Sequence, residues 1–126
     1  MVTPHELIEQ VRAAVLRRDV DAAVELVTED VVIEHPFGPP GMPPRIEGRE
    51  TVRAHFSAAF ARSTLEISKF EDHAVHQTTD PDVIVIECEL HARNREGGEQ
   101  VNRRYVQVIQ ARDGKIALWR DYVHVD

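Results

Sequence analysis

The chain has 126 residues, of which 42% are hydrophobic and 29% charged, and a formal net charge of −7 from 22 acidic and 15 basic side chains. This length predicts one domain, residues 1–126, and the acidic balance argues against nucleic acid or an anionic membrane as the main partner. The lone cysteine, Cys88, excludes an intrachain disulfide. The N-terminus has no apolar leader, and no apolar run is near the roughly 20 residues that span a bilayer. We therefore expect a cytoplasmic protein.

The first predicted element is a helix that begins near Pro4. Thr3 is a suitable cap, Pro4 suits the first helical position, and Glu6 completes a capping box. The helix has one apolar stripe at helical spacing, made by Leu7, Ile8, Val11, Ala14 and Val15. A second, short helix is predicted next, with Val20, Ala23, Val24 and Val27 on its apolar side. Residues 28–30 should then form a corner that leads into the first strand.

The stretch from Val31 to Gly38 begins with the alternation of a strand. On that pattern His35 lies on the same face as Val31 and Ile33. Pro36 removes a backbone donor and favours extended geometry in the residue before it, so we expect the strand to end there. An imidazole would then stand on the apolar face at the strand tip. It is either a half-buried residue bonded to backbone or a general base in a pocket.

A stiff loop and a third helix follow. Residues 36–44 include five prolines and two glycines, which excludes a central strand or a helix. Phe37 in this loop either covers a pocket mouth or packs on the surface. The third helix is predicted from about Gly48 to Arg62, and its buried stripe is Val52, Phe56, Ala59 and Phe60. His55 lies at the edge of that stripe, so it is either solvated or turned towards a pocket.

The rest of the chain has the pattern of strands. We predict them at residues 65–77, 83–93, 100–111 and 115–125, with hairpin signals at Gly97-Gly98 and Asp113-Gly114. Three helices followed by an antiparallel meander indicate the α+β class, in which the helices cover one face of a curved, mostly antiparallel sheet. Because the loop before the third helix is long, we expect this cone-shaped barrel to contain a cavity.

One charged residue stands on the apolar face of the last strand. Asp121 shares that face with Ala117, Trp119, Val123 and Val125, while Ile116, Leu118, Arg120, Tyr122 and His124 share the other. A carboxylate on such a face must be hydrogen-bonded, ion-paired or protonated. Asp121 is therefore either a structural partner of Arg103, Arg104 or Lys69, or an acid–base group with a raised pKa.

Further acids lie on the strand at residues 83–93. Glu87 and Glu89 share one of its faces, and Cys88 and Leu90 share the other. The two acids either lie in solvent or point into the cavity, where their mutual repulsion would raise at least one pKa.

The seven histidines raise the question of a metal site. His73 and His76 are three residues apart, a spacing that puts side chains on opposite faces of a strand. No His-x-Glu, Cys-x-x-Cys or His-Glu-x-x-His spacing is present, so we expect no metal. No nucleophile elbow or phosphate loop is present either, which argues against serine catalysis and nucleotide binding.

Several of these segments resemble a known family. The stretches Asp19–Val27, Ile33–Gly38 and Ile46–Glu50 are similar to those of SnoaL-like and ketosteroid-isomerase-like proteins, which implies the fold of the nuclear transport factor 2-like superfamily. By that resemblance His35 stands at the position of the isomerase's Asp base, and Val11 and Val106 stand at its two oxyanion donors. Because one lost oxyanion donor costs about 10²–10³ in rate, we do not expect a true ketosteroid isomerase.

Two other branches resemble the later part of the chain. The segments Gly114–Ile116 and Trp119–Tyr122 are similar to the last strand of limonene-epoxide-hydrolase-like proteins, which implies that Asp121 activates water and that Glu89 is a second acid. Glu87 replaces that family's Arg, and His35 replaces its water-positioning Asn. The phenazine-biosynthesis A/B proteins resemble residues 48–55 and 80–88, and they imply a site that contains His55 and Asp121.

These observations predict a cofactor-independent isomerase, cyclase or hydrolase that uses acid–base chemistry on a small apolar metabolite. The predicted catalytic residues are Asp121, His35, His55 and Glu89. The predicted substrate-binding residues are Trp119, Phe56, Phe60, Phe37 and Val106. The alternative is a non-catalytic module that binds a hydrophobic ligand or dimerises. We expect a homodimer, with Tyr105, Gln107, Ile109, Leu118 and Tyr122 on the outer face of the sheet.

Overall fold

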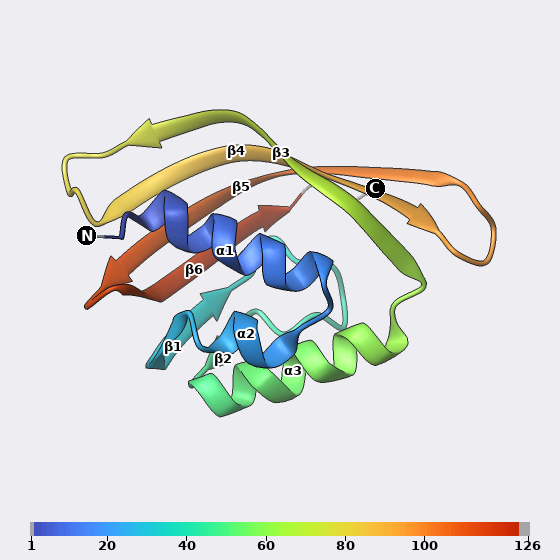
Figure 1. Ribbon diagram of the computed structural model, residues 1–126, viewed down its shortest axis with the longest axis horizontal. Helices are drawn as coiled ribbons and strands as arrows, with labels where there is room; N and C mark the ends of the chain where they lie inside the picture. Colours follow the sequence, from blue (N-terminus) through green and yellow to red (C-terminus); the bar gives the residue numbers. More distant parts are fainter. Residues whose placement is uncertain (1, 124–126) are drawn as a thin grey trace.

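The computed structural model describes residues 2–123, which form three helices against one side of a curved six-stranded sheet (Figure 1). The elements along the chain are α1 (Pro4–Leu16), α2 (Val20–Val24), β1 (Val27–Glu34), β2 (Arg45–Glu47), α3 (Arg49–Arg62), β3 (Leu65–Gln77), β4 (Val83–Asn94), β5 (Gln100–Arg112) and β6 (Lys115–Val123). This is the α+β architecture that the sequence predicts.

The helix ends follow from local chemistry. The hydroxyl of Thr3 accepts a hydrogen bond from the Glu6 backbone at 3.1 Å, and Pro4 opens α1. The carboxylate of Asp19 caps α2 in the same way, by accepting from the Ala22 backbone. Within residues 2–123, no helix combines the length and the apolar character needed to cross a bilayer.

The sheet has the strand order β2-β1-β6-β5-β4-β3. Strands β3 to β6 form an antiparallel meander, β2 pairs antiparallel with β1, and β1 pairs parallel with β6. This order brings the start of the chain beside its end, so that Ile33 lies opposite Trp119 in the register of β1 and β6. The tip of β1, with His35 directly after it, therefore lies next to the strand that carries Asp121.

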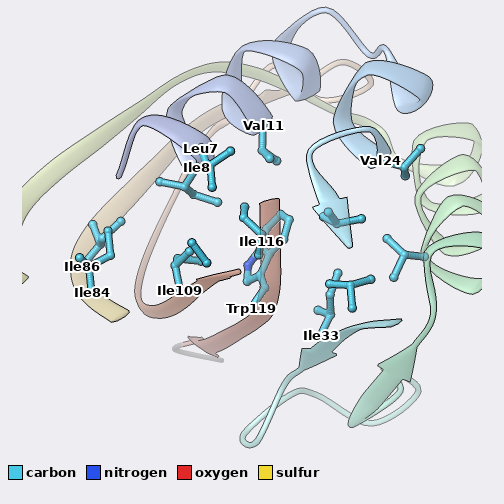
Figure 2. Packing of buried hydrophobic residues seen from close by; sticks show 14 of the residues in the cluster. Leu7, Ile8, Val11, Val24, Ile33, Ile84, Ile86, Ile109, Ile116 and Trp119 are labelled. Atoms are coloured by element: carbon cyan, nitrogen blue, oxygen red, sulfur yellow. The ribbon is translucent and has the colours of Figure 1, made fainter. Parts of the chain in front are cut away.

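The core lies between the helices and the inner face of the sheet (Figure 2). Leu7, Ile8 and Val11 of α1 are buried against Ile84 and Ile86, among other sheet residues. Helix α1 packs on β3 to β6, and α3 packs on β1 and β2. The predicted apolar stripes of both helices thus face the sheet.

The first two strands differ from the prediction. Strand β1 already begins at Val27, which pairs with Ile116 rather than ending a helix. The segment predicted as a corner is an irregularity inside β1, because the register with β6 shifts between Val27 and Val32. The short strand β2 was not predicted, since its three residues are too few to show alternation.

A bulge in β6 corrects the predicted face of Ile116. The β5–β6 register runs from Gln110 opposite Leu118 to Ala111 opposite Ile116, so that Ala117 is an extra residue. Ile116 therefore lies in the core with Trp119, and not on the outer face with Leu118. The predicted positions of His124 and Val125 lie outside the described residues.

Candidate functional site

A cavity of about 300 Å³ lies between α1, α3 and the inner face of the sheet. Its walls are mostly apolar, and its polar groups come from α1, α3, β5 and β6. The lining residues are Ile8, Val11, Arg12, Val15, His55, Phe56, Ala59, Phe60, Ile67, Phe70, Leu90, Arg103, Tyr105, Gln107, Trp119, Asp121 and Val123. A volume near 300 Å³ is at the lower end of the range for small-molecule sites.

Asp121 projects from β6 into this cavity, as the alternation of the last strand predicts. Its Oδ1 accepts one hydrogen bond from Trp119 Nε1 at 2.8 Å and another from Gln107 Nε2 at 2.9 Å. Its Oδ2 lies 3.9 Å from His35 Nε2, which is too long for a direct hydrogen bond. One carboxylate oxygen is therefore anchored by two donors, and the other has none within hydrogen-bonding distance among residues 2–123.

Burial raises the pKa of Asp121 above its ordinary value. The hydrogen bonds from Gln107 and Trp119 act in the opposite direction, as does the charge of His35, but desolvation is the largest effect. The side chain is 16% exposed. None of Arg103, Arg104 and Lys69, the cations that a structural pairing would have required, is in contact with this carboxylate.

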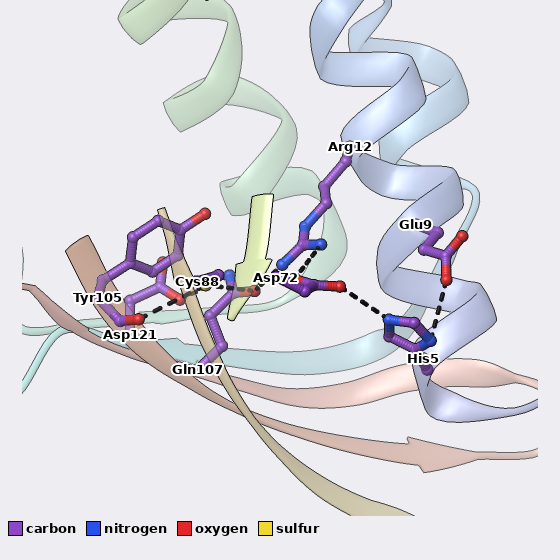
Figure 3. Close-up of polar contacts among 8 residues, drawn as sticks. All are labelled: His5, Glu9, Arg12, Asp72, Cys88, Tyr105, Gln107 and Asp121. Carbon is purple, nitrogen blue, oxygen red and sulfur yellow. Dashed lines mark hydrogen bonds and ion pairs between the residues drawn. The ribbon is translucent and has the colours of Figure 1, made fainter. Parts of the chain in front are cut away.

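A polar chain continues from Asp121 to the surface through residues that the sequence did not place in the site (Figure 3). Gln107 accepts from Arg12 Nη2 at 3.2 Å, and Arg12 Nη1 contacts Asp72 Oδ1 at 2.7 Å. Asp72 in turn contacts His5 at 2.9 Å. Arg12 and Gln107 are both buried, so this chain satisfies groups that would otherwise be costly to hide from water.

His35 lies next to Asp121, directly after the end of β1. Its side chain is 11% exposed, and Nδ1 is buried without a hydrogen-bond partner among the described residues. The backbone N–H of His35 donates to the carbonyl of Pro44, which fixes the chain at the start of the proline loop. The structure thus brings His35 and Asp121 together, although His35 does not itself line the cavity.

His55 enters the cavity from α3 together with two phenylalanines. Phe56 lies edge-on to Trp119 with ring centroids 6.0 Å apart, and Phe60 stacks on Phe56 at 6.3 Å. These aromatic side chains form the predicted apolar wall. Burial, together with the charges of His35 and Arg62, lowers the pKa of His55 below its ordinary value.

Two predicted substrate-binding residues lie elsewhere. Phe37 is 69% exposed and packs on Tyr122 at the outer face of the sheet, with ring centroids 5.6 Å apart. Val106 lines a separate hollow on that outer face. Tyr105 and Gln107, expected on the outer face, instead line the cavity, because β5 presents its odd-numbered residues inwards around this point.

Glu89 also lies outside the cavity. Leu90 faces inwards and lines the cavity, while Glu87 and Glu89 point outwards, to contacts with His76 and His73 at 2.5 and 2.9 Å. The structure therefore places both acids on the outer face.

The placement of His73 and His76 corrects the predicted opposite faces. The register of β3 and β4 shifts between Asp72 and Ala74, and this bulge at His73 turns both histidines outwards. Within residues 2–123, one group has the composition of a metal site, because ligand atoms of Glu71, His73 and Glu89 lie within 4.8 Å of one another. This outer group is separate from the cavity.

The model of the SnoaL-like domain matches residues 8–119. The chain belongs to the SnoaL-like family. The PhzA/B-like protein PA3332 of Pseudomonas aeruginosa is 34% identical over 98 residues, which cover 78% of this chain and 67% of the relative.

Solved structures agree with this SnoaL-like assignment. The structure of a provisionally assigned isomerase from Bacillus subtilis superposes with a TM-score of 0.85 at 28% identity, and covers 95% of this chain and 85% of that one. RV0760c from Mycobacterium tuberculosis, in complex with estradiol-17beta-hemisuccinate, gives a TM-score of 0.79 at 26% identity and covers 99% and 97%. The predicted superfamily fold is confirmed.

Proposed function

We propose that this SnoaL-like protein is a cofactor-independent enzyme of the isomerase, cyclase or hydrolase kind that transfers protons on a small, largely apolar metabolite. The observation that carries the proposal is the asymmetry of Asp121. Asp121 lines a mostly apolar cavity, two donors hold its Oδ1, and its Oδ2 has no hydrogen bond among residues 2–123. A fixed carboxylate with one free oxygen is suited to take a proton from, or give one to, a bound molecule.

The environment of Asp121 suits it to acid–base catalysis. Catalysis by a general acid or base is most efficient when the pKa of the group lies near the working pH, and burial raises the pKa of Asp121 in that direction. Gln107 and Trp119 fix the orientation of the carboxylate. Folding has therefore already oriented the carboxylate, and substrate binding does not have to supply that free energy.

The two histidines have different roles in this proposal. His35 Nε2 faces Asp121 Oδ2, so we infer that His35 accepts at Nε2 the proton that Asp121 takes from the substrate, becomes an imidazolium, and later returns that proton through Asp121. His55 lines the cavity from α3 and is the second proton-transfer group, because its lowered pKa keeps the ring neutral near pH 7. Phe56, Phe60 and Trp119 provide the apolar walls.

The comparisons support this proposal at the level of the reaction class. A Bacillus subtilis relative is provisionally assigned as an isomerase, and RV0760c was solved with a steroid ester. A ketosteroid isomerase mechanism is not proposed, because Val11 lines the cavity where that enzyme's hydroxyl donor would be expected.

The test is proton exchange in D₂O. We expect the protein to promote deuterium incorporation into cyclohex-2-enone, or to open limonene 1,2-epoxide, and we expect Asp121→Asn to lower that rate about 10²–10⁴-fold. Asn is isosteric, so binding of the probe should survive. If Asp121→Asn keeps most of the rate, Asp121 is not the acid–base group and the proposal fails.

The alternative is a non-catalytic module that binds a hydrophobic ligand in the same cavity. Trp119 is the only tryptophan of the chain and lines the cavity, so its fluorescence reports occupancy. Binding that quenches Trp119 without any deuterium exchange or epoxide opening would favour this module over an enzyme.

We also infer a homodimer formed through the outer face of the sheet. Phe37 is 69% exposed beside Tyr122, and with Val106 these residues line a hollow of about 310 Å³. A second copy would cover the exposed Phe37 ring and this hollow. Sedimentation should show a dimer at micromolar concentration, and Phe37→Asp should shift it to a monomer. A wild-type monomer under those conditions would refute the inference.

A further inference from the structure

The cavity has a cationic group at a distance from Asp121. Arg103 lies on the inner face of β5 and lines the cavity together with Tyr105 and Gln107. These three side chains alternate along one strand. Gln107 pairs with Asp121 in the β5–β6 register, and Arg103 is four residues away from Gln107. At the rise of a strand this separation is roughly 13 Å.

Arg103 differs from the other arginines around it. Arg12 lines the same cavity but is neutralised by Asp72 at 2.7 Å, and Arg104 on the outer face lies 3.6 Å from Glu89. Among residues 2–123, Arg103 has neither an ion pair nor a side-chain hydrogen bond. Its guanidinium is therefore available to a ligand, and it presents five N–H donors in a planar fork that matches a carboxylate.

A second hollow continues from this end of the cavity. It measures about 340 Å³ and shares Val15, Phe60 and Ile67 with the first. Its lining includes Arg18, which lies over the Phe60 ring at 5.3 Å, and Arg95, which donates to the Ser63 carbonyl at 2.7 Å. Neither arginine forms an ion pair among the described residues. With Glu66 on the same lining, this end carries more cationic than anionic side chains in a chain whose net charge is −7.

We propose that the metabolite of this site is an elongated monocarboxylic acid, whose apolar body spans the aromatic wall and whose carboxylate binds Arg103, away from Asp121. The inference rests on the proposed function for the position of the reacting end. The Asp121 end excludes the carboxylate of such a ligand, because two carboxylates there would repel each other. The arginine end attracts it, and the ligand therefore enters in one orientation.

Two pairs of probes differ only in the acidic group. Estradiol-17beta-hemisuccinate and estradiol share a steroid body, and decanoate and 1-decanol share a thinner chain. Binding is measured by quenching of Trp119, the only tryptophan. We expect the wild-type protein to prefer the acid of a pair by about 3-fold or more, because an Arg–carboxylate contact is a charge-assisted hydrogen bond, and the exposure of Arg103 to solvent weakens it.

Two neighbouring variants separate a specific contact from a general charge effect. Arg103→Gln should abolish the preference while the neutral probe binds as before. Arg104→Gln removes the same charge from the outer face and should keep the preference. Equal preference in wild type and Arg103→Gln would overturn the proposal, as would a failure of all four probes to quench Trp119. The catalytic proposal is tested separately, because Asp121→Asn should keep the acid preference while it loses proton exchange.

Discussion

Gln107 donates its amide N–H to Asp121 over 2.9 Å, and its carbonyl oxygen accepts from Arg12 over 3.2 Å. These two contacts fix which way the amide points. Because Gln107 is buried, it links the catalytic candidate to the ion pair of Arg12 and Asp72 without placing a charge next to the carboxylate. Asp121 is thereby held in one orientation while burial continues to raise its pKa.

The first prediction concerns the effect of pH on Asp121. A carboxyl group whose pKa is raised by folding binds more protons in the folded state, so its contribution favours folding below its ordinary pKa of 3.8 and is lost as pH rises through the raised value. Asp121→Asn is neutral at every pH. We expect the variant to be more stable than wild type near pH 7, and this difference to shrink as the pH approaches 4.

Urea unfolding at a series of pH values measures that difference. Asp113→Asn, in the exposed β5–β6 turn, is the control and should show no comparable trend. A pH-independent difference between wild type and Asp121→Asn would contradict the raised pKa.

The second prediction tests the polar chain. Gln107→Leu removes a partner from both Arg12 and Asp121, and it leaves two buried charged groups with an unmet hydrogen bond each. Such a change should cost about 2–5 kcal/mol of unfolding free energy. Chemical denaturation measures it, with Gln100→Leu at the exposed start of β5 as the control. A loss below about 0.5 kcal/mol, the level of an ordinary surface change, would mean that water replaces Gln107 without cost.

The main candidates were accessible from sequence because their signals are local. Asp121 is the only charge on the apolar face of its strand, and His35 is fixed on such a face by the proline that follows. The apolar stripe of the third helix was enough to predict Phe56 and Phe60 as part of the cavity wall. His55 was left open by its position at the edge of that stripe, and the structure turns it into the cavity.

Other residues could not be found in this way. Arg12 and Gln107 are polar residues on amphipathic elements, where a solvated position is the ordinary expectation. The two partners of Arg12, Asp72 and Gln107, lie 60 and 95 residues from it along the chain, so only the folded topology brings them together. The bulges at Ala117 and His73 each insert one residue and reverse the alternation beyond it, which explains the wrong faces of Ile116 and His76.

The third prediction separates the inner from the outer candidates. Glu89 and Val106 lie on the outer face of the sheet, so Glu89→Gln and Val106→Ala should leave the rate of deuterium exchange unchanged. His55→Gln and Asp121→Asn, which alter the cavity, should lower it. The comparison uses the same cyclohex-2-enone assay for all four variants. If Glu89→Gln lowered the exchange rate as much as Asp121→Asn does, the prediction that the chemistry takes place on the inner face of the sheet would be contradicted.

The last prediction concerns the pKa of His55 and its electrostatic cause. Burial is the largest effect, and the positive charge of Arg62 adds to it, so the folded state favours the neutral ring. The resulting stability is present above the ordinary pKa of 6.5 and is lost as pH falls towards the lowered value. Arg62→Gln removes one of the charges. We therefore expect NMR titration of the His55 ring to give a higher pKa in Arg62→Gln than in wild type. Arg53→Gln, on the same helix but paired with Glu50 at 3.1 Å, should leave the His55 titration unchanged. An equal shift in both variants would assign the effect to the net charge of α3, and no shift in either would leave burial and the charge of His35 as its causes.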